Sequence, residues 1–465
     1  METNKIINEP TWTRVGKFIS RFFQGHLWEG RNYINGQWGT TKEIYTNVNP
    51  ATLTSLGAFP KSSKTEVHAA YQAARTAFED WKNVSRFVRS DYLNRVAKII
   101  EERRDELATV ISLETGKNYN ESVAEVNEAL HMAQFAFGSG RYSHGEVVAS
   151  EIGEKDSYML RKPKGVIAIV SPFNFPLAIG GFWCAAPAMV EGNTVILKPS
   201  EDAPMSSQLC AEIYEEAGLP QGVFNVVHGE GETGALLVQE NVDHICFTGS
   251  AAVGMEIRKE AARSWHKTTS CEMGSKSACI VFDDVEMDLA IEATIASAFK
   301  LSGQRCVSSG RMIVQRTVYD EFVERFSEEA AKLKTGNPFS ILTQSTGMPE
   351  AIAWDKTIPN ENMYYGPLIN KQGYDKVCSF NKLVRLDENT EVVLDGVCPD
   401  IDARGYFLTP MVYKSEWRDV PYLKDEVFGP HVAIVPFDEM EDAIRIYNDT
   451  EYGLAVGVLT NDFRK

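Results

Sequence analysis

The sequence lacks the cysteine spacings that mark a metal centre or a disulfide framework. No two of its eight cysteines are closer than eight positions, so it has no CxxC motif and no zinc-type spacing. A chain of 465 residues without a secretion signal does not need disulfides. We therefore expect reduced thiols in a cytoplasmic protein, most of them core residues. The cysteines are Cys184, Cys210, Cys246, Cys271, Cys279, Cys306, Cys378 and Cys398.

Long apolar runs and a leader sequence are also missing. No uninterrupted apolar stretch reaches the length of a transmembrane helix, and the N-terminus contains no signal-peptide core. Residues 13–23 are basic and amphipathic, as in a transit peptide, but Glu2 and Glu9 favour a surface helix of the folded domain. We therefore expect no membrane partner.

The chain has fewer basic residues than acidic residues. The chain has 47 Lys and Arg residues against 64 Asp and Glu residues, a net charge of −17, which argues against binding to a nucleic acid or to an anionic membrane. Internal repeats and low-complexity tracts are absent, which excludes solenoids and disordered scaffolds. With 43% hydrophobic residues, the composition is typical of a soluble enzyme of about two to four domains.

The periodicity of apolar residues changes along the chain. Residues 64–137 have the 3.6-residue repeat of amphipathic helices. Over residues 165–250, short β-branched runs alternate with helical stretches, and a second alternation begins at residue 277. Residues 142–165 alternate polar and apolar side chains, as a protruding β-hairpin does. The expected fold class is α/β, with two doubly wound domains that meet near residue 271.

Three residues could carry chemistry. Cys306, in LSGQRCVSSGR, is either a small buried side chain or a nucleophile. Asn174, in PFNFP at the end of a predicted strand, could donate to an oxyanion or form an Asx-turn. Glu272, in SCEMGSKSA, is expected in apolar surroundings, which raise the pKa of a carboxylate and suit it to general-base work. A buried structural carboxylate is the alternative reading of Glu272.

Two further stretches could bind a nucleotide. Gly249 and Gly254, in FTGSAAVG, lie where a strand passes into a helix. Backbone N–H groups there could face a phosphate, or the glycines could form only a tight turn. Lys198 and Glu201, in LKPSE, follow a buried strand at the edge where α/β sheets bind ligands. They could hold ribose hydroxyls or form a salt bridge with each other.

Seven motifs occur along the chain in a fixed order: PFNFP, GNTVILKPSE, FTGSAAVG, CEMGSKSA, GQRC, YGPLIN and DEVFGP. With them, the chain resembles the NAD(P)-dependent aldehyde dehydrogenase superfamily from about residue 30 to its end. The resemblance implies a Rossmann-like cofactor domain and a catalytic domain. It also implies an enzyme that oxidises a small-molecule aldehyde to a carboxylic acid, with NAD or NADP as acceptor.

The same resemblance assigns roles to individual residues. Cys306 is the expected nucleophile, Glu272 the base that activates water, and Asn174 the oxyanion donor together with the Cys306 N–H. Lys198 and Glu201 are the expected ribose contacts, and Glu201 favours NAD because a carboxylate repels a 2′-phosphate. The implied cofactor contacts are Ser171, Pro172, Phe173, Lys198, Ser200, Glu201, Gly231, Phe247, Gly249, Ser250, Val253, Met273, Gly274, Glu426 and Phe428. No metal is implied.

The expected domains follow from the motifs. An NAD-binding domain would comprise residues 1–141 and 161–271, an oligomerisation hairpin residues 142–160, and a catalytic domain residues 272–465. Relatives of this family continue for several dozen residues with a Gly-rich segment beside the substrate tunnel and a strand that pairs with a neighbouring subunit. The C-terminal part of the catalytic domain is therefore expected to be missing, although a homodimer or tetramer is still expected.

Some residues depart from the family pattern. Ser275 stands where a second glycine is usual, and Phe173 and Trp183 stand where Trp and Lys are frequent. The connection over residues 337–366 is about a dozen residues longer than usual, which predicts a surface loop.

Four functions stay open from the sequence. The first is a general aldehyde dehydrogenase that forms a carboxylic acid. The second is a dehydrogenase specific for glutamate semialdehyde (pyrroline-5-carboxylate), which PFNFP and KPSEDAP favour. The third is a thioester-forming or esterase-like relative, although the presence of Glu272 argues against a CoA-dependent enzyme. The fourth is a truncated, inactive paralogue that binds only nucleotide.

Overall fold

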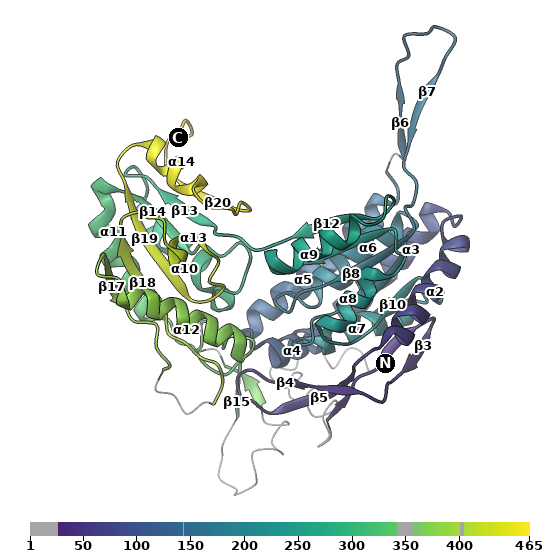
Figure 1. The fold of residues 1–465 in the computed structure, drawn as a ribbon, viewed down its shortest axis with the longest axis horizontal. Coiled ribbons are helices and arrows are strands. Elements are labelled where there is room, and N and C mark those ends of the chain that lie inside the picture. The colour runs from purple at the N-terminus through teal and green to yellow at the C-terminus, as the bar shows by residue number, and fades with distance from the viewer. Residues whose placement is uncertain (1–26, 143, 342–356, 361, 400–403) are drawn as a thin grey trace, which may run out of the picture.

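The structure is a computed structural model, and it describes residues 27–142, 144–341, 357–360, 362–399 and 404–465. Its described part contains a seven-stranded and a six-stranded β-sheet, which lie in two separate bodies flanked by helices (Figure 1). The N-terminal stretch that we expected to form a surface helix lies outside the described residues.

The seven-stranded sheet has the order β12-β11-β8-β9-β10-β2-β3. Strands β8 to β12 pair in parallel, whereas β2 pairs antiparallel with both β10 and β3. The strands are β2 Asn32–Ile34, β3 Gln37–Gly39, β8 Val166–Val170, β9 Thr194–Lys198, β10 Phe224–Val226, β11 His244–Thr248 and β12 Thr268–Glu272.

The direction of strand addition reverses at β8. Strands β9 and β10 extend the sheet on one side of β8, and β11 and β12 extend it on the other. The carboxyl ends of β8 and β11, at Val170 and Thr248, therefore flank a topological switch point. Open α/β sheets bind their ligands at such a point, because the connections that leave it pass to opposite faces.

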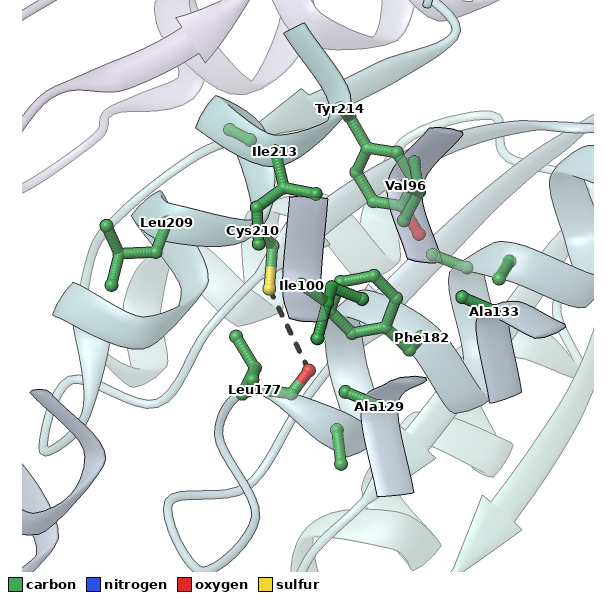
Figure 2. Packing of buried hydrophobic residues seen from close by; sticks show 14 of the residues in the cluster. Val96, Ile100, Ala129, Ala133, Leu177, Phe182, Leu209, Cys210, Ile213 and Tyr214 are labelled. Atoms are coloured by element: carbon green, nitrogen blue, oxygen red, sulfur yellow. Dashed lines mark hydrogen bonds between the residues drawn. The ribbon is translucent and has the colours of Figure 1, made fainter. Parts of the chain in front are cut away.

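Helices cover both faces of this sheet because its central strands are apolar on both sides. Ile167 and Ile169 of β8 point to one apolar cluster, and Val166 points to the other. Figure 2 shows the first cluster, where Cys210 Sγ donates to Leu177 O at 3.8 Å. The helices are α2 Lys64–Trp81, α3 Arg86–Glu102, α4 Arg104–Thr115, α5 Tyr119–Ser139, η2 Ile179–Cys184, α6 Ala185–Val190, α7 Pro204–Glu216, α8 Gly231–Gln239 and α9 Ala251–Ala261.

The six-stranded sheet has the order β17-β18-β19-β14-β13-β20, and only β17 runs antiparallel to its neighbour. Its strands are β13 Ala278–Val281, β14 Arg311–Gln315, β17 Thr390–Leu394, β18 Met411–Ser415, β19 His431–Phe437 and β20 Val456–Leu459. Its helices are α10 Met287–Phe299, η3 Lys300–Gly303, η4 Arg316–Val318, α11 Tyr319–Ala331, α12 Lys371–Leu386, α13 Pro421–Lys424 and α14 Met440–Asn448.

Smaller sheets complete the described part. Strands β6 and β7 pair antiparallel and project away from the rest of the molecule (Figure 1). Strands β15 and β16 pair within the long connection whose middle lies outside the described residues. The bounds are β1 Trp28–Glu29, β4 Ile44–Val48, β5 Ser55–Pro60, β6 Gly145–Val148, β7 Ser157–Leu160, β15 Phe339–Ile341 and β16 Thr357–Pro359.

The link between the two larger sheets falls where the sequence changes its alternation. Strand β12 of one sheet ends at Glu272, and strand β13 of the other begins at Ala278. The domain boundaries expected from the sequence stay predictions. Across the segments that the structure describes, no helix has the length and apolar character of a membrane span.

Candidate active site

Strand register explains how Glu272 and Cys306 come close. Glu272 ends β12, and a short link then enters β13 at Ala278. Ala278 pairs with Arg311 of β14, and Cys306 lies on the turn just before that strand. The link after Glu272 leads into β13 and the turn with Cys306 leads into β14. Because β13 and β14 are paired, the link and the turn lie side by side. Ser277 Oγ in the link donates to the Cys306 carbonyl at 3.4 Å.

The turn before Cys306 has a strained backbone. Leu301 and Ser302 have φ values of 52° and 55°, and Gly303 follows at 71°. Positive φ costs a non-glycine residue about 1–3 kcal/mol, so the surroundings must hold this shape. The Leu301 N–H donates to Glu121 Oε2 at 3.2 Å, and Ser302 Oγ donates to Gly366 O at 2.6 Å.

A second loop packs against this turn. A Cβ atom at Gly303 would lie only 2.3 Å from Gly429 O, so this close approach of two backbones requires glycine. Phe428, just before Gly429, also has a positive φ, of 61°. Gln304 also anchors the turn to the segment around Ile369, because its Oε1 accepts a hydrogen bond from the Ile369 N–H at 3.0 Å. The loop that places Glu426 and Phe428 is thereby held against the loop of the candidate nucleophile.

Asn174 lies beside the same turn. Its buried side chain donates through Nδ2 to Gln304 O at 3.0 Å, across 130 positions of sequence. An amide nitrogen carries two hydrogens, so one remains after this bond. Asn174 Oδ1 has no hydrogen-bond partner among the described residues. The amide is therefore oriented by the turn that carries Cys306 two positions after Gln304.

Aromatic contacts fix the loop that carries Asn174. The rings of Phe173 and Phe428 meet edge-on, with centroids 6.0 Å apart. Phe175 stacks on Trp183 at 6.4 Å and receives Lys117 Nζ over its ring at 4.1 Å. Phe173 and Trp183, which depart from the family pattern, thus both take part in holding this loop.

Glu272 differs from what the sequence predicts. Its side chain is exposed at the end of the edge strand β12, so the expectation of apolar surroundings is wrong. The physical reason is that β12 has only β11 as a neighbour, which leaves one side of the strand open. An exposed carboxylate there has free access to water.

The thiol of Cys306 is half-buried and near two carboxylates. Burial raises the pKa of Cys306, and the negative charges of Glu426 and then Glu272 raise it further. Hydrogen bonds from the backbone N–H groups of Cys306 and Val307 lower the pKa in part. The carboxylates of Glu426 and Glu272 therefore both disfavour the thiolate form of Cys306.

Ser275 contacts both Cys306 and Glu426, a role that the sequence did not reveal. Its hydroxyl donates to the Cys306 carbonyl, and its backbone N–H donates to Glu426 Oε1 at 2.8 Å. The hydroxyl also lies 2.9 Å from Ser277 Oγ. The only signal in the sequence was the serine in place of a second glycine, and a serine alone does not indicate its partner.

Lys276 is a second residue that the sequence did not single out. Its Nζ donates to Tyr422 O at 2.9 Å and to Asp425 O at 2.6 Å. Burial, with a contribution from Arg311, lowers the pKa of Lys276 to about 7. Lys276 thus fixes the segment that carries Glu426.

A cavity of about 400 Å³ opens at the switch point of the first sheet, between α8 and α9. Lys198 and Glu201 both line it, and Lys198 Nζ lies 3.1 Å from Glu201 Oε2. The salt bridge expected as one alternative is thus present, and it stands at a cavity. Lys198 is buried, whereas the Glu201 side chain is 42% exposed and can accept a further hydrogen bond.

About half of the predicted cofactor contacts line this cavity. They are Ser171, Lys198, Ser200, Glu201, Gly231, Phe247 and Val253. Glu426 and Phe428 instead line a small cavity of about 30 Å³ with Ser275 and Gly429, beside the Cys306 turn. The remaining predicted cofactor contacts line neither of these two cavities. They are Pro172, Phe173, Gly249, Ser250, Met273 and Gly274.

The turn after β11 has a definite geometry. Ser250 caps α9, because its side chain accepts from the Val253 N–H at 3.4 Å. The Gly249 N–H donates to Glu272 O at 3.0 Å, which connects this turn to the candidate base. A Cβ at Gly254 would lie 2.6 Å from the sulfur of Met273, so this glycine serves close packing.

Comparison with known proteins identifies the family. The model of the aldehyde dehydrogenase family matches residues 38–465, so this chain belongs to that family. The expected fold class is thereby confirmed, and the chain is an oxidoreductase that acts on aldehydes.

Several relatives cover most of the chain. It is 35% identical over 438 residues to 1-pyrroline-5-carboxylate dehydrogenase of Staphylococcus saprophyticus, a match that covers 92% of this chain and 80% of the relative. It is 33% identical over 444 residues to aldehyde dehydrogenase [NAD(P)+] 1 of Saccharomyces cerevisiae, covering 93% and 83% of the two chains. The crystal structure of betaine aldehyde dehydrogenase from Staphylococcus aureus in complex with NAD+ superposes with a TM-score of 0.87 at 29% identity. That match covers 96% of this chain and 86% of the other.

Proposed function

We propose that this chain oxidises an aldehyde to a carboxylic acid through a covalent bond to Cys306. The Cys306 thiolate adds to the aldehyde carbon, which forms a C–S bond and leaves the negative charge on oxygen. The remaining hydrogen of Asn174 Nδ2 and the Cys306 N–H donate to this oxyanion. The hydrogen bond from Asn174 to Gln304 O, at 3.0 Å, carries the proposal, because it places the amide at the nucleophile's turn.

The cavity residues fit a dinucleotide cofactor. A volume of about 400 Å³ suits a ligand of this kind, and the buried Ser171 Oγ, which lines the cavity, has no hydrogen-bond partner among the described residues. Relatives whose names specify NAD(P)+ and neighbours solved with NAD+ support the same cofactor class. When NAD is bound, the chemistry it supplies is acceptance of the hydrogen and electron pair that the tetrahedral carbon gives up. Lys198 and Glu201 would hold its ribose, and Glu426 would lie on the nicotinamide side.

Glu272 completes the reaction. After oxidation, the substrate carbon is a thioester on Cys306, and its hydrolysis needs an activated water. Glu272 is exposed to solvent and its charge reaches the Cys306 sulfur. It takes a proton from water while the water oxygen attacks the thioester carbon. The carboxylic acid then leaves, and the thiol regains its proton.

The test separates the two half-reactions. We expect the wild-type chain to form NADH with an aldehyde. Cys306→Ala should lower that rate by about 10³-fold or more while NAD binding persists. Glu272→Gln should keep a first burst of NADH and lose steady turnover, because only thioester hydrolysis is slowed. Cys398→Ser, at an exposed cysteine, is the matched control and should keep the wild-type rate.

Two results would contradict this function. Unchanged NADH formation by Cys306→Ala would remove Cys306 as the nucleophile. No NADH formation by the wild-type chain with any aldehyde, although it binds NAD, would favour the nucleotide-binding alternative.

The substrate class is a second proposal. A semialdehyde such as glutamate semialdehyde is favoured by the similarity to pyrroline-5-carboxylate dehydrogenases, 35% in sequence and 30% for a solved structure. Relatives named for betaine aldehyde and for general aldehyde oxidation match nearly as well, so the panel should include betaine aldehyde and short aliphatic aldehydes. A kcat/KM for glutamate semialdehyde no higher than for the aliphatic aldehydes would contradict this specificity.

We further propose that the β6–β7 hairpin mediates assembly into a homodimer or tetramer. The hairpin projects from the molecule (Figure 1). The side chains of Val147, Tyr158, Met159 and Leu160 on it are apolar and exposed. An exposed apolar surface of this kind favours association. Light scattering coupled to gel filtration should give a mass above that of one chain, and Tyr158→Lys with Leu160→Lys should reduce it. A wild-type mass equal to one chain would contradict the proposal.

A further inference from the structure

A buried ion pair that the proposed mechanism does not use lies beside the Asn174 loop. Lys117 precedes α5 by two positions, and Glu125 lies within this helix. Lys117 Nζ donates to Glu125 Oε2, and the two side chains are 1% and 0% exposed. A charged group this far from water is costly unless all its hydrogen-bonding atoms have partners. The other oxygen of Glu125 therefore needs partners of its own.

That oxygen holds the backbone that follows the Asn174 loop. Glu125 Oε1 accepts from the Leu177 N–H at 2.9 Å and from the Ala178 N–H at 3.1 Å. Ala178 is the N-cap of η2, so these N–H groups lie at the start of a helix, where no acceptor within the helix is available. A carboxylate is also favoured there because a helix N-terminus carries partial positive charge. Glu125 thus fixes the start of η2.

The ion pair also contacts the loop itself. Lys117 Nζ lies over the ring of Phe175, the residue next to Asn174, at 4.1 Å from the ring centre. Pro176 stands between Phe175 and Leu177, and its ring fixes φ at about −65°. The few residues between Asn174 and Leu177 therefore have little backbone freedom. A displacement of the start of η2 would be passed on to the Asn174 amide.

The same face of α5 contacts the turn of the candidate nucleophile. Glu121 lies four positions before Glu125, so the two side chains share one face of the helix. Glu121 Oε2 accepts from the Leu301 N–H at 3.2 Å, in the strained turn before Cys306. Helix α5 therefore holds both segments that the hydrogen bond of Asn174 joins. It sets how the loop of the amide lies against the turn of the thiol.

We propose that Glu125 is a positioning residue that holds the Asn174 amide where it donates to the oxyanion, with Lys117 as its counter-ion. The proposal rests on the oxyanion role of Asn174 proposed above. A donor stabilises an oxyanion only when it lies about 2.7–3.1 Å from the oxygen, so a small displacement of the loop is enough to lower kcat. Glu125 needs no contact with the substrate, because it acts through residues 175–178.

The test compares two double variants that differ in one acceptor oxygen. Lys117→Met with Glu125→Gln removes both charges and keeps an oxygen for the η2 N–H groups. Lys117→Met with Glu125→Leu removes the charges and this oxygen at similar side-chain volume. We expect the first to keep kcat for NADH formation within about threefold of wild type, because a buried ion pair replaced as a whole leaves no unpaired charge. The second should have a kcat about 10- to 100-fold lower than the first.

Two further readouts separate positioning from general damage. KM for NAD should stay near wild type in both double variants, because neither Lys117 nor Glu125 lines the large cavity. In an Asn174→Ala background the amide is already gone, so the ratio of kcat between the two double variants should fall below about twofold. A ratio that stays unchanged in this background would mean that Glu125 only supports the fold, and it would overturn the proposal. Equal kcat values of the two double variants with Asn174 present would overturn it as well.

A second variant covers the case in which the Glu125→Leu protein does not fold, as judged by circular dichroism. Glu125→Asp keeps the charge and the lysine but moves the oxygens by one methylene group. Its kcat should be lower than wild type, and this loss should again disappear in the Asn174→Ala background. If Asn174→Ala alone keeps the wild-type kcat, the oxyanion role itself is wrong. If Asn174→Ala loses activity while the Glu125 variants do not, only the positioning role is wrong.

Discussion

The backbone N–H of Ser275 donates to Glu426 Oε1 at 2.8 Å, while the hydroxyl of the same serine donates to the carbonyl of Cys306. One residue therefore joins the Glu426 carboxylate to the loop of Cys306. A Cβ at the preceding Gly274 would lie 2.3 Å from Glu426 Oε2, so the carboxylate lies directly against this backbone. Substitutions at Gly274, Ser275 or Glu426 should therefore change the reactivity of the Cys306 sulfur.

Removing the charge of Glu426 should make Cys306 more reactive at neutral pH. The carboxylate disfavours the thiolate and so raises the pKa of Cys306. In Glu426→Gln the pKa of Cys306 should be lower than in the wild type. At pH values between the two pKa values, the variant therefore has the larger thiolate fraction. Well above both pKa values, Cys306 is almost fully ionised in both proteins, and their rates should be equal. The rate of alkylation by iodoacetamide, followed against pH, should show its midpoint shifted to lower pH.

Glu272→Gln is the matched control for this experiment. Glu272 also raises the pKa of Cys306, but it is a weaker cause than Glu426. Its midpoint should therefore shift in the same direction by a smaller amount. A midpoint in Glu426→Gln that stays at the wild-type pH, or moves upward, would contradict the electrostatic assignment.

The Ser275 hydroxyl should matter for catalysis more than for folding. Ser275→Ala keeps the backbone bond to Glu426 and loses the bond to the Cys306 carbonyl. One hydrogen bond contributes about 0.5–1.5 kcal/mol, so we expect kcat to fall by roughly three- to tenfold. KM for NAD should change little. Ser275→Thr, which keeps a hydroxyl, should retain more activity than Ser275→Ala; equal loss in both would point to packing as the cause.

Asn174→Ala should remove the side-chain donor for the oxyanion. Loss of one such donor typically lowers kcat by about 10²–10³-fold. The variant also leaves the carbonyl of Gln304 without this partner, so its thermal unfolding should be measured in parallel. NAD affinity should stay near wild type, because Asn174 lies outside the residues that line the large cavity. A kcat within twofold of wild type would exclude the role as oxyanion donor.

Glu201 should set the preference between NAD and NADP. Its carboxylate lines the cavity together with Glu256 and Glu260, and Lys198 balances only part of this negative charge. A 2′-phosphate would be repelled there, so Glu201→Gln should raise the ratio of kcat/KM for NADP to that for NAD by about tenfold, or about 1.4 kcal/mol. Glu232→Gln, at an α8 residue outside the cavity lining, should leave the ratio unchanged. A fall in the ratio for Glu201→Gln would reverse the assignment.

The fold class could be predicted from the sequence because it depends on local patterns. The β-branched runs that became β8 and β9 are buried on both faces, and this burial requires the apolar alternation that the sequence displays. The candidate residues were also visible, since Asn174 follows β8, Lys198 ends β9, and the carboxyl ends of parallel strands share one edge. The contact between Asn174 and Gln304, which are 130 positions apart, could not be deduced from either segment alone.

The sequence by itself determined the chemical groups that this protein has available: one thiol after Gly-Gln-Arg, a carboxylate before a glycine link, and an amide between prolines. Only the tertiary structure decided their surroundings. Glu272 is exposed because β12 is an edge strand, and Ser275 reaches Cys306 because β13 and β14 are paired. Strand order and packing bring together residues that are distant in the chain, so no local pattern of residues carries that information.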